Sequence, residues 1–354
     1  MRKYFLDNLR WMAVLLLFPY HTFMIYNNFE SFYIHGPPNA ILSSFISVVW
    51  PWFMPLLFTI AGISAYYSLK RRNSKEYLKE RVLRLFIPFV SGLILLIPIQ
   101  TYFAEKFHNG FTGSYLSQFV MFFTKFGDLT GYAGGFTPGQ LWFILYLFII
   151  SVIALPVIIL YKKSELKVNF GRLNLLTLLP LFIIPMVMSP ILDISGKSLG
   201  AFFAFFIIGY LILSIDNIQN SLKKYSKHLC FVFIIYAIAL LFLSYGLPLS
   251  ISGILIDILY GFFAWLGILS FLGIAKKHLN FHNTWTDYFT NASYPIFIFH
   301  QTWIVAVAYY VFLLTSSILL QVIIIISVSF ILTILTYELM KRFKLTRFLF
   351  GIKE

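Results

Sequence analysis

Residues 317 to 339 read SILLQVIIIISVSFILTILTYEL, a run of 23 residues in which the one charged side chain, Glu338, stands near the far end. A hydrocarbon core of about 30 Å needs about 20 apolar residues in helical form, so this segment is long enough to span a bilayer. The same pattern recurs along the chain, because 60% of the 354 residues are hydrophobic and 11% are charged. Soluble domains carry about 25% charged residues, so the composition excludes a water-soluble globular protein.

Ten runs of this kind are separated by short polar gaps. At membrane depth each backbone N–H must be bonded within its own segment, and none of the runs alternates as a barrel strand does, so we expect helices. The predicted fold class is all-α: a polytopic integral membrane protein of about ten transmembrane helices, forming a single transmembrane domain over residues 1–354. The expected spans are residues 6 to 27, 41 to 69, 85 to 104, 141 to 161, 173 to 192, 198 to 215, 229 to 246, 250 to 274, 289 to 313 and 317 to 339.

The basic residues indicate the orientation of these spans. If the N-terminus is cytoplasmic, alternate gaps hold 24 of the 27 Lys and Arg, as the positive-inside rule requires. We therefore expect a multi-pass protein of the cell membrane with both termini in the cytoplasm. The net charge of +14 lies in short loops rather than on a soluble basic face, so we exclude a nucleic-acid partner. The single cysteine, Cys230, excludes an intrachain disulfide and a multi-cysteine metal site.

Two further features concern the shape of the chain. The largest extracytoplasmic segment, roughly residues 105 to 140, contains a semi-apolar stretch, residues 115 to 126, which predicts an interfacial helix followed by a glycine-rich loop. Pro51 and Pro55 in the second span and Pro295 in the ninth predict kinks that expose backbone carbonyls inside the bundle.

Four ionisable residues inside the predicted spans stand out: Arg10, His21, Asp257 and His300. A charge at the bilayer centre costs at least about 2.5 kcal/mol, so each is a candidate site residue. Arg10 and His21 are eleven residues apart, which is three turns plus about 20° of helix, so they share one face about 16 Å apart. The first span therefore directs a cation and an imidazole into the same bundle interior.

Each of these residues also has a structural explanation. Arg10 suits a snorkelling anchor at the cytoplasmic headgroups. His21 and His300 suit hydrogen-bonded structural histidines. Asp257, which we expect deep in the eighth span, needs a proton or a cationic partner, so a structural ion pair is the alternative to a functional role.

A cationic loop precedes the third span. Residues 70 to 84 carry seven Lys and Arg, and Arg81 and Arg84 at their end are three residues apart, so a regular helix places them on one face. Paired guanidinium groups suit phosphate oxygens, and this predicts an anion site at the cytoplasmic mouth.

These residues resemble the membrane-bound acyltransferase-3 family, which acylates glycans and other cell-surface acceptors, and the resemblance covers essentially the whole chain. The stretch Tyr4-Phe5-Leu6-Asp7-Asn8-Leu9-Arg10, followed by ten residues and His21, is similar to the Arg-x10-His motif of the family. The further matches are Arg81-x-x-Arg84, Phe58-Thr59-Ile60-Ala61-Gly62, Leu141-Trp142-Phe143, and Ser293-Tyr294 through His300. The N-terminal stretch is most similar to the glucan-succinylating branch.

Two positions depart from the family pattern. Ala61 stands where many members have Ser before the glycine, and Gln140 precedes Leu-Trp-Phe where His is frequent. Any role that those side chains play in other members is therefore not expected here.

The resemblance implies an enzyme, an acyltransferase transferring groups other than amino-acyl groups. The implied reaction is O-acylation, with acetyl or succinyl moved from cytoplasmic acyl-CoA, acetyl-CoA first, to a hydroxyl of a glycan or other acceptor of the cell envelope. His21 is expected to act as general base or to form an acyl-histidine, and Arg81, Arg84 and Arg10 to hold the donor phosphates. His300 and Asp257 are expected to orient the imidazole or to line the acceptor path, and no metal is expected.

The layout of charges also suits a protein of another class. A cationic mouth above a polar, kinked bundle interior is what a carrier or channel for an anionic solute needs. No inverted repeat is visible in the sequence, which favours the enzyme.

Overall fold

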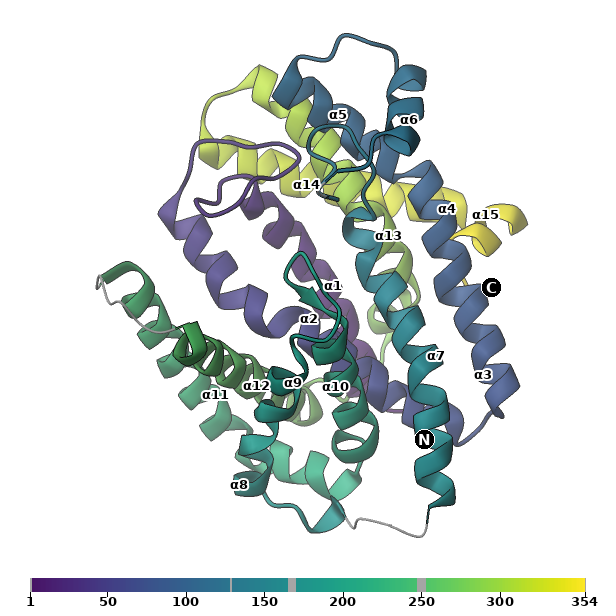
Figure 1. Ribbon diagram of the computed structural model, residues 1–354, viewed down its shortest axis with the longest axis vertical. Helices are drawn as coiled ribbons and strands as arrows, with labels where there is room; N and C mark the ends of the chain where they lie inside the picture. The colour runs from purple at the N-terminus through teal and green to yellow at the C-terminus, as the bar shows by residue number, and fades with distance from the viewer. Residues whose placement is uncertain (1, 128, 165–169, 247–252, 354) are drawn as a thin grey trace. The chain divides into compact units, whose positions relative to one another are not determined.

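A computed structural model describes residues 2–127, 129–164, 170–246 and 253–353 (Figure 1). Parts of two expected segments, residues 165–169 of a cytoplasmic loop and residues 250–252 of the eighth span, lie outside these ranges. The described chain is helical, apart from a hairpin of two short antiparallel strands, β1 (Asp193–Ile194) and β2 (Lys197–Ser198). The predicted all-α class is confirmed.

The helices follow the apolar runs of the sequence closely. They are α1 (Tyr4–Met24), α2 (Ala40–Leu69), α3 (Ser74–Arg81), α4 (Ile87–Leu95), α5 (Ile97–Asn109), α6 (Tyr115–Thr124), α7 (Trp142–Lys163), α8 (Leu175–Leu178), α9 (Ile183–Met188), α10 (Leu199–Ile208), α11 (Asp216–Gly246), α12 (Gly253–His278), α13 (Thr284–Leu314), α14 (Ile318–Met340) and α15 (Lys344–Leu349). Short turns join some of them: the π-helical η1 (Val82–Phe86) and η5 (Gly209–Leu213), and the 3₁₀ turns η2 (Gly139–Leu141), η3 (Phe170–Arg172) and η4 (Leu179–Phe182).

Seven helices among the described residues are long and apolar enough to cross a membrane. They cover Ala40–Leu69, Ser74–Asn109, Gly139–Lys163, Asp216–Leu243, Gly253–His278, Thr284–Leu314 and Ile318–Met340. Each coincides with one of the ten spans expected from the sequence, so the chain is a polytopic membrane protein.

The other three expected spans are helical but differ in length or polarity. Leu175–Met188 and Leu199–Leu213 have between 10 and 17 residues, and at 1.5 Å per residue this is at most about 26 Å, short of the hydrocarbon core. The first, α1, has 21 residues but carries Asp7, Arg10 and His21. Seven of the ten expected spans therefore have the length and composition to cross a membrane, and the other three stay predictions.

The described chain divides into two compact units. Unit 1 comprises the described residues within Met1–Ala13, Ser47–Arg81 and Tyr146–Asp287, and unit 2 those within Val14–Ile46, Val82–Leu145 and Tyr288–Glu354. In unit 1, α11 and α12 lie side by side (Figure 1), and α10 packs against α9. The indole of Trp265 is fully buried and donates to the Leu178 carbonyl at 2.9 Å, which ties α12 to α8.

Two glycines set a close crossing within unit 1. A methyl group at Gly62 of α2 would lie 2.0 Å from the Phe206 carbonyl oxygen, and one at Gly209 would lie 2.4 Å from that of Thr59. Two helices in a membrane bundle can approach this closely because each glycine has no side chain to separate it from the backbone of the neighbouring helix. Helix packing is therefore sufficient to explain the motif of residues 58 to 62, without a catalytic role.

Unit 2 contains α4 to α6 and α13 to α15. The amphipathic stretch at 115 to 126 forms α6, as predicted, and packs against α5. Ser114 caps its N-terminus by accepting from the Ser117 N–H. Helices α13 and α14 are joined by two side-chain hydrogen bonds, Trp303 Nε1 to Thr336 Oγ1 at 2.9 Å and Tyr288 Oη to Glu338 Oε1 at 2.9 Å.

The crossing at Gly62 can be tested by substitution. We expect Gly62→Ala to lower the stability of the detergent-solubilised protein by about 1–3 kcal/mol, because the new methyl group forces α2 and α10 apart. Gly261→Ala is the matched control, since its methyl group would meet one Phe182 ring carbon at 3.6 Å, an ordinary contact. Equal thermal unfolding midpoints for the two variants would contradict the packing role.

Candidate active site

Arg10 and His21 both lie on helix α1, as the sequence predicts. Their spacing of eleven residues places them about 16 Å apart along the axis. Arg10 belongs to unit 1 and His21 to unit 2. The surroundings of each residue are therefore described within its own unit.

In unit 2, the imidazole of His21 lies within a cluster of rings. Its ring centroid is 5.2 Å from that of His300 of α13, with 38° between the planes. Phe32 stacks on it at 5.9 Å and 13°. The side chain of His21 is half-buried, and its Nδ1 atom is buried without a hydrogen-bond partner. A histidine of this kind is both fixed by aromatic neighbours and partly accessible.

The hydrogen bonding of His300 indicates its tautomer. Its side chain is fully buried, and Nδ1 lies 2.7 Å from the Phe297 carbonyl oxygen. A carbonyl accepts hydrogen bonds and cannot donate them, so in the neutral ring the proton belongs on Nδ1. The lone pair is then on Nε2, which is buried and has no partner.

The unpaired nitrogens, His21 Nδ1 and His300 Nε2, suggest that the two imidazoles take part in proton transfer or ligand binding. Leaving a buried polar atom without a partner costs about 1–3 kcal/mol, and nearly all such atoms in folded proteins are satisfied. A purely structural histidine uses both ring nitrogens in hydrogen bonds, whereas His21 and His300 each have one buried ring nitrogen without a partner. Two neighbouring imidazoles with free nitrogens can accept, hold and return a proton from a bound hydroxyl.

Gln301, which follows His300, belongs to a buried cluster of amide side chains. Gln100 donates to the Gln140 side-chain oxygen at 3.0 Å and to Thr302 Oγ1 at 2.8 Å, and Gln301 donates to Gln100 at 3.2 Å. Gln140 also donates to the Ile298 carbonyl at 2.9 Å. The four side chains are each at most 6% exposed. They connect α5, η2 and α13, so Gln140 has a structural role at the position where related sequences often have His.

In unit 1, the side chain of Arg10 is held from two directions. It donates to Ser64 Oγ of α2 at 2.7 Å and lies 3.6 Å from the Asp7 carboxylate, which also binds Arg2 at 2.8 Å. Asn8 is buried and donates to the carbonyls of Leu279 and Phe281, which fixes this end of α1. Arg10 is therefore a positioned, ion-paired cation.

The second arginine motif spans the junction of α3 and η1. Arg81 lies over the Tyr77 ring at 4.8 Å and contacts Glu80 at 3.3 Å, and Glu80 also pairs with Arg72. The Nε atom of Arg81 is buried without a partner. Arg84 lies in the π-helical turn, which has more residues per turn than an α-helix, so the one-face arrangement expected for Arg81 and Arg84 does not follow from regular helix geometry.

Asp257 does not have the surroundings that the sequence led us to expect. It is the fifth residue of α12, and its side chain is exposed rather than deeply buried. The structure places it in unit 1, whereas His21 and His300 are in unit 2.

Several polar residues of the site escaped the sequence analysis. Asp7, Glu80 and Ser64 pair with the arginines, and Gln100 and Gln301 form the buried amide cluster. The available signal was the presence of uncharged amides within apolar runs, because a buried amide needs partners much as a charge does. A search restricted to ionisable residues passes over them.

Comparison with known proteins adds a family assignment. The model of an acyltransferase domain matches residues 3–338. Similar curated proteins include Glucans biosynthesis protein C of Salmonella paratyphi B, Salmonella heidelberg and Salmonella enteritidis, each 28% identical over 168 residues. The match covers 46% of this chain and 41% of each relative, so it spans less than half of their length. No solved structure gives a significant match.

The family match covers nearly the whole chain and includes α1, both arginine motifs and His300. It favours the enzyme over the anion carrier that the charge layout also suits. The long apolar helices agree with a membrane location. The chain therefore belongs to the acyltransferase 3 family and is a membrane-bound acyltransferase.

Proposed function

We propose that this enzyme transfers an acyl group, acetyl or succinyl, from cytoplasmic acyl-CoA to a hydroxyl of an extracytoplasmic glycan. The donor class comes from the family resemblance. The glycan is supported by the similarity to proteins named Glucans biosynthesis protein C, which covers less than half of their length. The observation that carries the proposal is the His21–His300 pair with its unpaired ring nitrogens, inside a chain of an acyltransferase family.

In the proposed reaction, His21 is the general base. Its imidazole takes the proton of the acceptor hydroxyl while the hydroxyl oxygen attacks the thioester carbonyl. The carbon–sulfur bond then breaks, and the sulfur leaves as CoA thiolate, which takes the proton back from the imidazolium. The products are the ester and CoA, and His21 returns to its neutral form. In the alternative path, His21 attacks the thioester itself and an acyl-histidine passes the acyl group on.

His300 has a supporting role in this scheme. Its Nδ1 is held by the Phe297 carbonyl, so its free Nε2 can accept a hydrogen bond from the acceptor hydroxyl or from the other imidazole. The buried amide cluster beside it limits movement of α13. His300 thus orients the groups that His21 acts on.

The arginines are assigned to the donor. Arg81, Arg84 and Arg10 are proposed to hold its phosphates, since guanidinium groups bind phosphate oxygens through paired N–H donors. The buried, unpartnered Nε of Arg81 supports this assignment, because it leaves a donor position open beside the Glu80 contact.

The proposal includes a topology. We take the whole chain as one transmembrane domain with ten crossings and cytoplasmic termini, in which the three shorter or more polar helices also cross the membrane. Asp257 is proposed to line the extracytoplasmic approach of the acceptor rather than to pair with a histidine, because its side chain is exposed near the start of α12.

The role of His21 is tested by removing its basic nitrogen. We expect His21→Ala to lower acyl transfer by about 10²- to 10⁴-fold, the usual contribution of a positioned general base. His21→Gln keeps a hydrogen-bonding side chain but takes no proton, so it should be similarly slow. His228→Ala, at an exposed histidine of α11, is the control and should keep full activity. Normal turnover of the His21 variants with acetyl-CoA and succinyl-CoA would remove His21 from the mechanism.

The donor assignment predicts a binding defect rather than a loss of chemistry. Arg81→Ala should raise the Kd for acyl-CoA by about 10- to 150-fold, since a hydrogen bond to a charged group contributes about 1.5–3 kcal/mol. Arg81→Lys should restore affinity in part, because an ammonium lacks the forked contact. Lys75→Ala removes an exposed cation of the same loop and is the control. Unchanged Kd values in calorimetry of the Arg81 variants would leave Arg81 as a topology signal.

Sidedness is tested in sealed vesicles of known orientation. Acyl-CoA should be consumed when it is supplied on the side that carries both termini, and the acylated glycan should appear on the other side. Product found on the donor side would refute transfer across the membrane, while the role of His21 would stand.

A further inference from the structure

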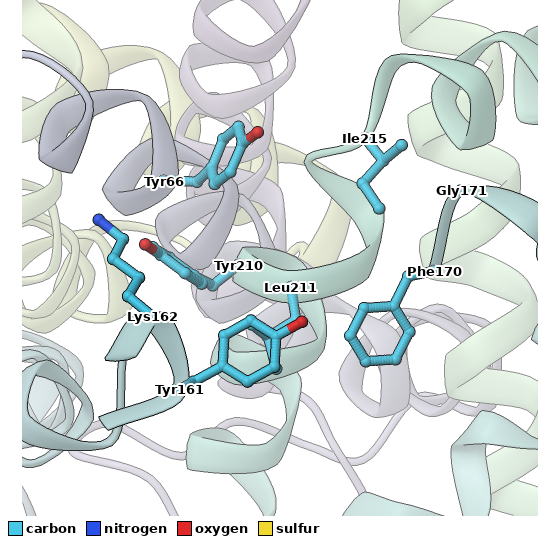
Figure 2. Close-up of a pocket in the computed structure, with 8 residues that line it drawn as sticks. All are labelled: Tyr66, Tyr161, Lys162, Phe170, Gly171, Tyr210, Leu211 and Ile215. Carbon is cyan, nitrogen blue, oxygen red and sulfur yellow. The ribbon is translucent and has the colours of Figure 1, made fainter. Parts of the chain in front are cut away.

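A cavity of about 330 Å³ lies in unit 1, whereas the histidine pair belongs to unit 2 (Figure 2). Its walls include Tyr66 of α2, Tyr161 and Lys162 at the end of α7, Phe170 of η3 and Tyr210 of η5. Ligand pockets for small molecules and cofactors have volumes of about 300–1,000 Å³ and are lined by aromatic groups with a few polar ones. This cavity has the size and the composition of such a pocket.

Aromatic rings dominate the lining. Figure 2 shows Tyr66, Tyr161, Phe170 and Tyr210 arranged around the space. Tyr66 and Tyr210 meet edge to face at 5.6 Å and 80°, and Tyr161 lies 6.5 Å from Phe170 with 34° between the planes. Tyr66, Tyr161 and Phe170 are half-buried, so part of each ring remains accessible. Accessible ring faces favour a flat, polarisable ligand, because every nucleobase can stack on an aromatic side chain.

The charges around the cavity favour an anion. Lys162 is one of the lining residues and is exposed, and the Lys70 ammonium lies 4.3 Å from the Tyr66 ring centre. The lining residues include no Asp or Glu. The nearest carboxylate along the chain, Asp216, directly follows Ile215 of the lining and binds Lys3 at 2.6 Å. The electrostatic potential at the cavity is therefore positive.

The position of the cavity matches the expected donor side. Tyr66 and Tyr161 stand near the ends of helices that lead into Lys- and Arg-rich segments, and Ile215 directly precedes α11, which carries Lys223, Lys224 and Lys227. The positive-inside rule assigns these segments to the cytoplasm. Tyr210 lies in the π-helical turn η5, and such turns occur often at functional sites. With this topology, we expect a ligand that enters from the cytoplasm to reach the cavity.

We propose that this cavity binds the adenine nucleotide end of the acyl-CoA donor. The adenine ring stacks among Tyr66, Tyr161 and Phe170, and Lys162 lies beside a phosphate group. This assignment rests on the proposed function, in which acyl-CoA is the donor, and it names the part of the protein that recognises the nucleotide. An anionic lipid headgroup shares the phosphate but has no flat ring, so the four aromatic walls favour the nucleotide.

The test measures binding of adenosine 3′,5′-bisphosphate, the nucleotide half of CoA, to the purified full chain in detergent. We expect binding to the wild type, and a loss of about 5- to 150-fold for Tyr161→Ala and Phe170→Ala, the range found for removing a stacked base contact. Tyr161→Phe keeps the ring and should bind normally. Tyr225→Ala, at an exposed tyrosine of α11, is the matched control for loss of a phenol.

The contribution of charge is measured separately. Lys162→Gln should weaken bisphosphate binding a few-fold at low salt and by less at high salt, because an exposed cation is screened. Lys163→Gln, at the neighbouring exposed lysine, is the control. Phosphopantetheine, the other half of CoA, should bind equally to the wild type and to Tyr161→Ala, and ATP should compete more weakly than acetyl-CoA.

The outcomes separate this inference from the proposed function. If acyl transfer is absent with every CoA donor while Tyr161→Ala still abolishes bisphosphate binding, the proposed function fails and the nucleotide site stands. If transfer is normal and the KM for acetyl-CoA is unchanged in folded Tyr161→Ala and Phe170→Ala, the nucleotide site is wrong and the proposed function stands. Binding of glycerol phosphate in place of the bisphosphate would also overturn it. Equal ATP and acetyl-CoA competition would overturn the donor assignment.

Discussion

The need to satisfy every backbone hydrogen bond within the bilayer governs the rest of this structure. Because lipid offers no partners for N–H and C=O groups, the apolar runs become long helices, and seven of these are long enough to cross. Helices that contain few polar side chains associate mainly through close packing, which is why Gly62 and Gly209 sit where one helix meets the backbone of its neighbour. In such an interior, any polar side chain needs a specific reason to be there.

That constraint also determines how much could be predicted. The helices, the shared helix of Arg10 and His21, and α6 follow from hydropathy and helical periodicity, which are local properties of the sequence. The proximity of His21 and His300 does not, because it depends on the packing of α1 against α13, far apart in the chain. The exposure of the Asp257 side chain does not follow from the sequence either, because an apolar window shows where a span lies but not which face of its helix packs inward. The π-helical turn at η1 has no signal in the pattern of charges either.

Within unit 2, two kinds of buried polar side chain lie next to each other and differ in how fully they are bonded. Gln100 and Gln140 bond to each other and to their neighbours across three elements, which fixes the register of α13. His300, directly before Gln301, uses Nδ1 for a carbonyl and leaves Nε2 without a partner. The hydrogen bonds of the cluster give rigidity, although Gln301 Oε1 has no partner, and a rigidly held imidazole with an unused acceptor can accept a hydrogen bond from a ligand. The amides thus hold in place the histidine whose bonding is left incomplete.

Two of the candidate donor-binding arginines are each paired with a carboxylate. Arg10 contacts Asp7, and Arg81 contacts Glu80, so a phosphate that binds either arginine competes with a carboxylate. Partly exposed pairs of this kind contribute about 0–1 kcal/mol, whereas a charge-assisted hydrogen bond contributes about 1.5–3 kcal/mol. If the proposed donor binds here, its phosphate therefore gains more than the lost carboxylate contact contributed. Without a bound anion, Asp7 offsets the charge of Arg10 and Glu80 offsets that of Arg81, so neither guanidinium group is left without a counter-charge.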